Sequence, residues 1–426
     1  MILNLVYTKY GKRVAAKSLS TSCCFYFLVL IIFSSSCRKT EFRAVENPAY
    51  IRVFNNLNYE VSLSNKEELQ PFFCLFIDPE FDESGKPISG LVQSDFLDKR
   101  TIYASPNPAH SGASTSKFNP EYPGKDKVPT GPILNGFDLT NWAQISAGKR
   151  RIVFMSRPIS NVPFAQLPEE QQKKVFLDTI IDLKEHEVYT IHLLQKDFNT
   201  KQNGLYVREE NFHKLALSDT LTYVNFYNLS PNGFWQAENS LKPSVPKQSK
   251  SLRYGIRDTM NAFFTHISVD TAANGSLIDK RIPEFSYQFA GTIVRNIDQQ
   301  KVAPYYSFPI FLRANNTKKI YANTWQYLQL IVPPADPINN SLFLLPPNTY
   351  TGIVGEEFIK RKIYAYVLFD HSRYLAPDSE YLPSLLVNVH SGINNPQSFG
   401  VVNTLEIIGG NVYLSTVQRR YPRPIY

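Results

Sequence analysis

The sequence predicts an all-β protein in which two tandem β-sandwich domains follow a cleaved export signal. Short segments of alternating apolar and polar residues recur along the chain and end at Pro, Asn, Asp or Gly. Segments with the helical period are scarce, and aromatic residues, which favour strands, make up 13% of the chain. About 390 residues follow the export signal, enough for two domains that each bury a core.

Six segments show the alternation most clearly, and we expect each to form a strand: 49–54, 150–154, 188–194, 222–227, 327–331 and 363–369. Alternation of this kind predicts sheets that bury one face and expose the other to water. The last fifty residues alternate in the same way, with a candidate hairpin around Gly409 and Gly410. The single helix candidate is Pro168–Val175, whose first residues suit a first helical turn.

The strand-like segments repeat at a nearly constant spacing. Residues 50–55 match 223–228, 151–154 match 328–331, and 188–190 match 363–365, at spacings of 173, 177 and 175 residues. Three matches at one spacing predict a duplicated β-domain. The alternative is two unrelated β-domains that share Tyr- and Val-rich strands.

The repeat divides the chain into domains. We expect the first at 45–200 and the second at 218–375, with the polar segment 195–204 as the connection and 376–426 completing or appended to the second domain. Residues 104–135 and 236–251 are predicted to form long loops. Long loops on a rigid scaffold are where binding sites usually lie.

The first 36 residues have the anatomy of a secretory signal. Basic residues without acids precede an apolar run of about eleven residues, and Ser34-Ser35-Ser36-Cys37 follows. The run is too short for a hydrocarbon core that needs roughly twenty residues. Small residues directly before a cysteine are similar to the lipobox of bacterial lipoproteins, in which the cysteine is acylated and becomes the N-terminus.

We therefore expect 1–36 to be a lipoprotein signal peptide and Cys37 to be the lipidated residue. The lipobox usually has Leu or a similar residue at the position of Ser34, and a chance cysteine after an ordinary signal is the alternative. Of the other three cysteines, Cys23 and Cys24 leave with the signal, so Cys74 has no partner for a disulfide. We expect Cys74 to be a small buried apolar residue.

Loss of the signal also changes the charge. Four signal cations account for half of the net charge of +8, and no basic cluster with interleaved aromatic residues follows. The sequence therefore predicts no nucleic-acid partner.

Two strand motifs carry a family resemblance. Tyr50-Ile51-Arg52-Val53-Phe54-Asn55-Asn56 opens the part after the signal, and Val188-Tyr189-Thr190-Ile191-His192-Leu193 follows later. Behind a lipoprotein signal, this pair resembles Bacteroidota lipoproteins of the domain-of-unknown-function family 4397. The motifs cover about a tenth of the chain, and the long segment 104–135 departs from the compact family pattern. The resemblance implies two tandem Ig-like β-sandwich domains and an envelope location, and it carries no activity.

The sequence contains no recognisable catalytic or metal-binding motif. Its seven histidines form no HExxH, HxH or helically spaced ligand pair, and no nucleophile elbow, phosphate loop or dinucleotide fingerprint occurs. We therefore predict a non-enzymatic protein with no catalytic residue, no metal and no cofactor, although a triad assembled from distant residues stays open. On its strand, His192 is expected to face solvent or to have a structural role.

Three local patterns carry binding or modification hypotheses. The carboxylates Asp78, Glu80 and Asp82 alternate before Gly85, which suits a calcium loop or, more simply, a charged hairpin tip. The tryptophans Trp142, Trp235 and Trp325 are candidates for stacking on sugars, although burial is their usual fate. Four Asp-Thr-apolar triplets resemble the O-glycosylation acceptor site of exported Bacteroidota proteins. The alternative is that Asp-Thr is simply common where strands begin. The threonines of these triplets are Thr179, Thr220, Thr259 and Thr271.

These features predict a lipoprotein that is anchored to the outer membrane by the lipid on Cys37 and has a non-enzymatic binding role. The expected partners are the membrane, through that lipid, and a glycan, a peptide or another envelope protein. A structural or anchoring subunit of surface fibres, with the tail 403–426 as a donated strand, and a hydrolase with a dispersed site are the alternatives. The basic residues Arg38 and Lys39 favour the periplasmic face over the cell surface, because surface export in this phylum tends to use an acidic run there.

Overall fold

A computed structural model describes the chain over residues 45–57, 72–100, 122–124, 126–218, 221–238, 241–242, 257–271, 277–309, 324–334, 365–368, 384–388, 400–409 and 411–419. The chain divides into two units, Met1–Ala44 and Val45–Tyr426, and every described residue belongs to the second. Across these residues, no helix is long and apolar enough to cross a membrane. The predicted signal peptide, Cys37 and most of the two predicted long loops lie outside the described residues.

The fold is all-β, as the sequence predicts, and the first sandwich consists of two four-stranded sheets. The first outer sheet has the strand order β3 (Pro87–Leu97), β2 (Phe73–Phe81), β7 (Gly148–Ser156) and β8 (Val175–Leu183). The first inner sheet has the order β10 (Asn203–Glu210), β9 (Val188–Gln195), β1 (Pro48–Asn55) and β6 (Ala143–Ser146). A two-stranded ribbon of β4 (Ile133–Leu134) and β5 (Phe137–Asp138) accompanies them.

The second sandwich repeats this arrangement. Its inner sheet has the order β15 (Tyr306–Pro309), β11 (Leu221–Asn228), β19 (Val401–Ile408) and β20 (Asn411–Gln418). Its outer sheet has the order β13 (Leu277–Arg281), β12 (Thr259–Thr271), β16 (Thr324–Ile331), β18 (Ser384–Asn388) and β17 (Ala365–Leu368), and β14 (Gln288–Val294) also pairs with β12. The C-terminal strands β19 and β20 therefore belong to this sandwich, joined by a hairpin at Gly409.

The two inner sheets share one topology, which supports the duplication. β1 runs parallel to β9 and antiparallel to β6, and β11 runs parallel to β19 and antiparallel to β15. β10 and β20 complete the two sheets, antiparallel to β9 and β19. This pairing corrects the third sequence match: the counterpart of β9 is β19, because β19 lies beside β11, whereas β17 pairs with β18 in the outer sheet.

The polar segment 195–204 does not connect the two sandwiches, contrary to the prediction. β9 and β10 pair from Gln195 and Asn203 onward, so the residues between them form a hairpin turn within the first inner sheet. The chain passes to the second sandwich between β10 and β11 instead. There Phe212 and Leu217 are buried against residues of both inner sheets, so the connection is packed as part of the core.

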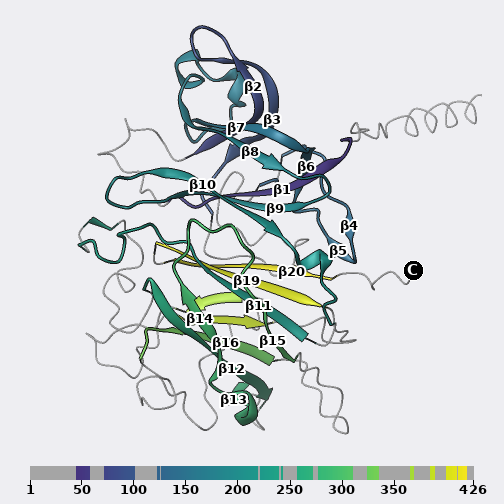
Figure 1. Ribbon diagram of the computed structural model, residues 1–426, viewed down its shortest axis with the longest axis vertical. Coiled ribbons are helices and arrows are strands. Elements are labelled where there is room, and N and C mark those ends of the chain that lie inside the picture. Colours follow the sequence, from purple (N-terminus) through teal and green to yellow (C-terminus); the bar gives the residue numbers. More distant parts are fainter. Residues whose placement is uncertain are drawn as a thin grey trace, which may run out of the picture. The chain divides into compact units, whose positions relative to one another are not determined.

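Apolar clusters fill the three spaces between the four sheets, which appear as successive layers in Figure 1. Representative members are Ile51, Phe154 and Ile191 in the first sandwich, Met260, Leu328 and Leu405 in the second, and Trp142, Val188 and Val402 between the inner sheets. The inner sheets are buried on both faces: every residue of β19 is buried, and so is β1 from Ala49 to Asn55. The prediction of one wet face is therefore wrong for these sheets.

Residues 168–175 do not form the predicted helix. They contain one 3-10 turn, Glu169–Gln171, and β8 begins at Val175. The N–H of Ser156 donates to the carbonyl of Lys174, so pairing with β7 already occupies the backbone there. A neighbouring turn places Phe164 over the outer face of the first outer sheet, where it packs with the buried, unpaired Cys74.

Candidate functional site

The two inner sheets face each other through equivalent residues, and we call this contact the seam. By strand register, Phe54, His192 and Tyr206 lie side by side on β1, β9 and β10, and Tyr227, Glu406 and Tyr413 do the same on β11, β19 and β20. Equivalent residues meet: His192 contacts Glu406, while Val188 with Val402, Leu194 with Ile408, and Tyr206 with Tyr413 share clusters. Contacts between equivalent residues are characteristic of an interface with two-fold symmetry. The two sandwiches of this one chain therefore pack against each other as the subunits of a symmetric dimer do.

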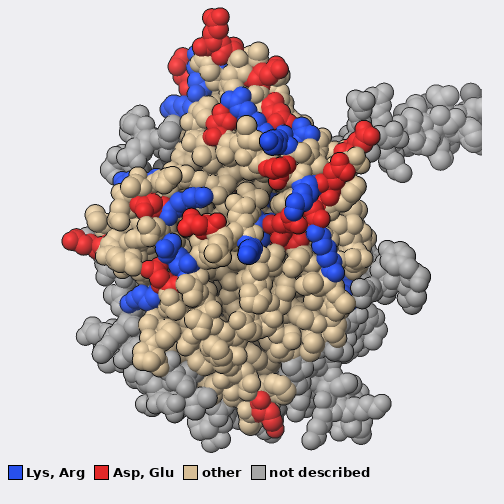
Figure 2. Space-filling view, in the orientation of Figure 1, with Lys and Arg blue, Asp and Glu red and all other residues tan. Residues whose placement is uncertain are grey.

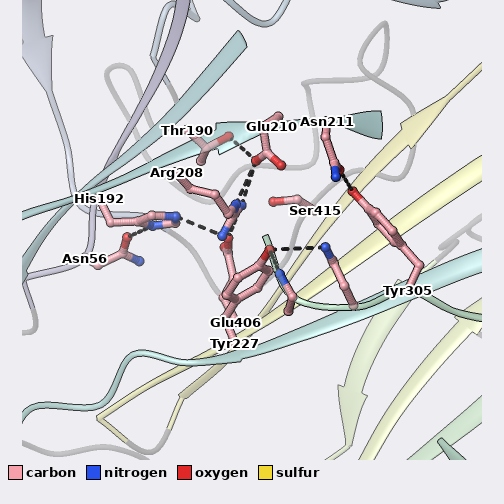
Figure 3. Close-up of polar contacts among 12 residues, drawn as sticks. Asn56, Thr190, His192, Arg208, Glu210, Asn211, Tyr227, Tyr305, Glu406 and Ser415 are labelled. Atoms are coloured by element: carbon pink, nitrogen blue, oxygen red, sulfur yellow. Dashed lines mark hydrogen bonds and ion pairs between the residues drawn. The ribbon is translucent and has the colours of Figure 1, made fainter. Parts of the chain in front are cut away.

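Glu406 lies at the centre of a buried ion-pair network in the seam (Figure 3). Its carboxylate oxygens lie 2.5 Å from Arg100 Nη1 and 2.7 Å from Arg208 Nη2. The side chains of Glu406 and Arg208 are 0% exposed, and that of Arg100 is 1% exposed. Charges buried this deeply are tolerated only when they are paired.

Glu210 extends the network on the side of the first sandwich. Nε and Nη2 of Arg208 both lie 2.9 Å from Glu210 Oε1, and the Thr190 hydroxyl donates to the same oxygen at 2.7 Å. On the other side, Arg100 donates from Nη2 to the Ser415 hydroxyl at 2.8 Å. Two arginines face two glutamates, so the charges of these four residues cancel within the seam.

His192 joins the network through both of its ring nitrogens. Its Nδ1 lies 2.9 Å from Asn56 Oδ1, and its Nε2 lies 3.2 Å from Glu406 Oε1. Burial lowers the pKa of His192 to about 4, an effect that Glu406 opposes only in part. Burial also acts to raise the pKa of Glu406, but His192, Arg100 and Arg208 together hold it well below its usual value. At neutral pH the carboxylate is therefore charged, and the two arginines balance it.

Aromatic rings hold the guanidinium groups in place. Arg100 lies 3.8 Å from the ring centre of Phe54 and 4.8 Å from that of Tyr413. Arg208 lies 4.3 Å from the ring centre of Tyr227. These cation–π contacts offset part of the desolvation of the arginines.

A pocket of about 270 Å³ opens beside the seam, at the second sandwich. Four aromatic residues and three amides line it: Tyr206, Phe226, Tyr227 and Tyr306, with Asn228, Asn296 and Gln299. Thr292, Ile293 and Val294 of β14 and residues 301–304 complete the wall. Among these described lining residues, Lys301 is the only charged one. Aromatic rings with a few polar groups are the usual lining of a small-molecule site.

Gly291 on β14 allows Tyr306 to form one side of the pocket. Its φ is 137°, and a Cβ at this position would lie 2.1 Å from the Tyr306 hydroxyl oxygen. The register between β12 and β14 shifts at the same place, next to Ala262, as in a β-bulge. Only glycine combines this backbone angle with so close an approach. The shape of the pocket therefore depends on Gly291.

Two tyrosine hydroxyls make hydrogen bonds beside the pocket. Tyr227 accepts a hydrogen bond from the N–H of Ala303 at 2.8 Å, which fixes one lining segment. Tyr305 donates to Asn211 Oδ1 at 2.9 Å, in the connection between the sandwiches (Figure 3). Burial raises the pKa of Tyr206 to about 12, so its hydroxyl stays protonated.

The structure separates the residues that the sequence predicted as sites. Cys37 and Thr220 lie outside the described residues. Thr179 is half-buried on β8, Thr259 is exposed at the start of β12, and Thr271 ends β12. Neither Thr179 nor Thr259 lines the pocket, and modification of the four threonines stays a prediction.

The acidic segment after β2 forms a hydrogen-bonded hairpin tip. Asp78 pairs with Arg150 at 3.0 Å, and Glu80 accepts from the Ser89 hydroxyl at 2.8 Å. Asp82 accepts from the Ser84 hydroxyl and from two backbone N–H groups, and these bonds lower the pKa of Asp82. In the described part of the chain, no group of three or more His, Cys, Asp or Glu residues could hold a metal ion.

Neither Trp142 nor Trp235 is among the described residues that line the pocket. Trp142 is fully buried in the seam, with the Arg52 guanidinium 4.3 Å from its ring centre. Trp235 is half-buried against the core of the second sandwich, and the side chain of Trp325 lies outside the described residues.

Sequence analysis missed the network because it treats a polar residue in an alternating strand as water-facing. Arg52, Arg208 and Glu406 occupy such positions and are buried. One signal was available: His192 and Glu406 occupy the same position in two matching strands. It becomes visible only when β9 is aligned with β19.

No protein-family model matches the chain, and no curated protein matches it. The candidate site therefore stands on its own geometry.

Proposed function

We propose that this chain is an exported bacterial lipoprotein that uses a non-enzymatic pocket to bind a partner in the cell envelope. The signal-like segment 1–36 and the small residues before Cys37 support the lipid anchor. The basic residues after Cys37 support a position on the periplasmic face of the outer membrane, in the manner of the Bacteroidota lipoproteins that the strand motifs resemble.

The observation that carries the binding role is the pocket beside the seam. Its aromatic residues lie on β10, β11 and β15 of the two inner sheets, and the amides of Asn296 and Gln299 lie on the loop that follows β14. The network in the seam holds the two sandwiches as one scaffold behind it. A preorganised wall limits the entropy lost on binding.

A non-enzymatic role fits the position of the one His–carboxylate contact in the network. The pair His192–Glu406 has the chemistry of a general base with its orienting partner, but both side chains are 0% exposed. Arg208 and Asn56 occupy the remaining polar positions around the pair. A substrate would therefore have to separate the inner sheets to reach it.

The surface charge does not favour a nucleic-acid partner. On the face shown in Figure 2, cationic and anionic side chains are interspersed over the first sandwich and beside the seam. The part of this face over the second sandwich carries few charges. Nucleic acid is usually bound by a continuous basic patch.

The alternative role as a fibre subunit needs an end strand that can be donated to another subunit. The candidate tail contains β19 and β20, and β19 lies between β11 and β20 with all its residues buried. Donation of this tail would remove two of the four strands of the second inner sheet. This arrangement favours the binding role.

Two experiments test the proposal in cells of the source bacterium. Incorporation of an alkyne-labelled fatty acid should be lost in Cys37→Ser and retained in Cys74→Ser; equal labelling of both variants would exclude the anchor on Cys37. Crosslinking from residue 301, with residue 288 on the exposed part of β14 as the matched control site, should capture one envelope component from residue 301 alone. Identical products from both sites would remove the support for a binding pocket.

A further inference from the structure

Because the two sandwiches are related by an internal two-fold axis, residues that line the pocket have equivalent residues in the other half of the seam. The N–H of Arg100 donates to the carbonyl of Asn55 at 2.7 Å, and the N–H of Asn296 donates to the carbonyl of Asn228 at 2.9 Å. Asn55 and Asn228 both end the first strand of their inner sheet, and each side chain accepts from the N–H two residues later. Asn296 therefore occupies the position in the second sandwich that Arg100 occupies in the first.

The two positions are filled differently. Arg100 enters the seam, where Phe54 and Tyr413 flank its guanidinium and Glu406 pairs with it. The counterparts of those two rings are Tyr227 and Tyr206, which line the pocket. Asn296 is shorter, lies at the surface and donates to Gln299 at 3.1 Å. The pocket thus lies beside the position that corresponds to that of Arg100, and the Arg208 guanidinium contacts Tyr227 from the seam.

The polar residue that faces this position also differs between the two halves. His192 stands where the other half uses the Glu406 carboxylate to pair its arginine. The described residues that line the pocket include no carboxylate, and Lys301 adds a positive charge at its rim. A cationic ligand would therefore meet no carboxylate among the described lining residues. An uncharged or acidic ligand meets aromatic rings, amides and hydroxyls.

We propose that the pocket binds one ring of an uncharged or acidic saccharide. This inference rests on the proposed binding function and adds the class of ligand. A pyranose has apolar C–H faces that suit the rings of Tyr306 and Phe226. Its hydroxyls match the amides of Asn296 and Gln299, which donate and accept. The volume of about 270 Å³ lies just below the range of about 300–1,000 Å³ for ligand pockets and suits a single terminal ring.

The test compares ligands on the mature chain, residues 38–426, by saturation-transfer NMR and calorimetry. The probes are the methyl glycosides of a hexose, an N-acetylhexosamine and a hexuronic acid. A methylated hexosamine with a free amine and an acetylated tripeptide with a free carboxylate complete the set. We expect at least one of the three glycosides to bind, and the free amine to bind most weakly.

Two pocket variants locate the site. Asn296→Met extends an uncharged side chain into the position that Arg100 fills in the other half, and Thr292→Phe narrows the pocket from β14. Each should weaken glycoside binding about tenfold or more. The matched control Gln288→Met changes an exposed residue of β14 outside the lining and should bind as the unaltered chain does.

The outcomes separate this inference from the proposed function. If none of the glycosides binds, or the tripeptide alone binds, the saccharide inference is overturned. If glycosides bind equally to the unaltered chain and both pocket variants, the site lies elsewhere and the inference is again overturned. In both cases an envelope component crosslinked from residue 301 would still support the binding role, so the two proposals fail separately.

Discussion

Replacing Glu406 with glutamine should destabilise the unit Val45–Tyr426 far more than the same change at its surface. The substitution keeps the shape of the side chain and removes one negative charge. Arg208 then keeps its pair with Glu210, whereas Arg100 loses the carboxylate with which it pairs, and these side chains remain buried. The change therefore tests the network without creating a cavity.

The expected magnitude follows from the geometry. Both arginines approach the Glu406 carboxylate within 2.7 Å. With about 4 Å between charge centres and an effective dielectric constant of about 20, each pair gains about 4 kcal/mol before desolvation. Desolvation offsets much of this gain, and the loss of one partner of a buried pair costs about 3–5 kcal/mol. We expect Glu406→Gln to lower the free energy of unfolding by that amount.

Urea unfolding at pH 7, followed by tryptophan fluorescence, measures the effect, since Trp142 is buried in the seam. The matched control is Glu209→Gln, whose carboxylate pairs at 2.8 Å with Lys184, a side chain that is 72% exposed. An exposed pair contributes at most about 1 kcal/mol. The control should therefore unfold close to the unaltered chain.

Acid should remove the difference between Glu406→Gln and the unaltered chain. The pKa of Glu406 is depressed in the folded state, so its stabilisation is present above the unfolded value of about 4.3 and is lost as pH falls through the folded value. A loss of less than about 1 kcal/mol at pH 7, equal to that of the control, would refute the account of the seam as a charge-locked interface.

Three further predictions concern the seam and the pocket. Burial lowers the pKa of His192 in the folded chain to about 4, so below pH 6.5 the unfolded chain takes up this proton first, and the free energy of unfolding should fall by up to about 3 kcal/mol between pH 6.5 and 4. The variant His192→Gln should flatten that part of the pH profile. An unchanged profile would contradict the burial of the ring. Gly291→Ala should displace Tyr306 and lower the free energy of unfolding in urea by about 1–3 kcal/mol. The exposed control Thr292→Ala should lower it by no more than about 0.5 kcal/mol. Equal losses for the two variants would show that Tyr306 moves freely. Deletion of residues 401–426 should abolish cooperative unfolding of the second sandwich, and a deletion variant that keeps the original transition would contradict the central place of β19.

Much of the all-β fold could be predicted from the sequence because strand alternation is a local signal. The segments at 49–54, 188–194 and 222–227 lie within β1, β9 and β11. The hairpin at Gly409 could also be predicted from the sequence, since a turn depends on only a few neighbouring residues. The counterpart of β9 could not be identified from the sequence, because the three-residue match of 188–190 with 363–365 fitted the expected spacing better than β19 did.

The sequence by itself determined several of the segments that form strands, the duplicated pattern, and the signal-like segment before Cys37. Only the tertiary structure decided which strand faces are wet, because alternation distinguishes two faces without telling what covers each. The stacking of two inner sheets buried Arg208 and Glu406 on the face that alternation assigns to water. The same stacking places Arg100 and Asn296 at equivalent positions of the two halves, and the pocket lies on the side of Asn296. This difference between the halves arises only where strands distant in the sequence meet.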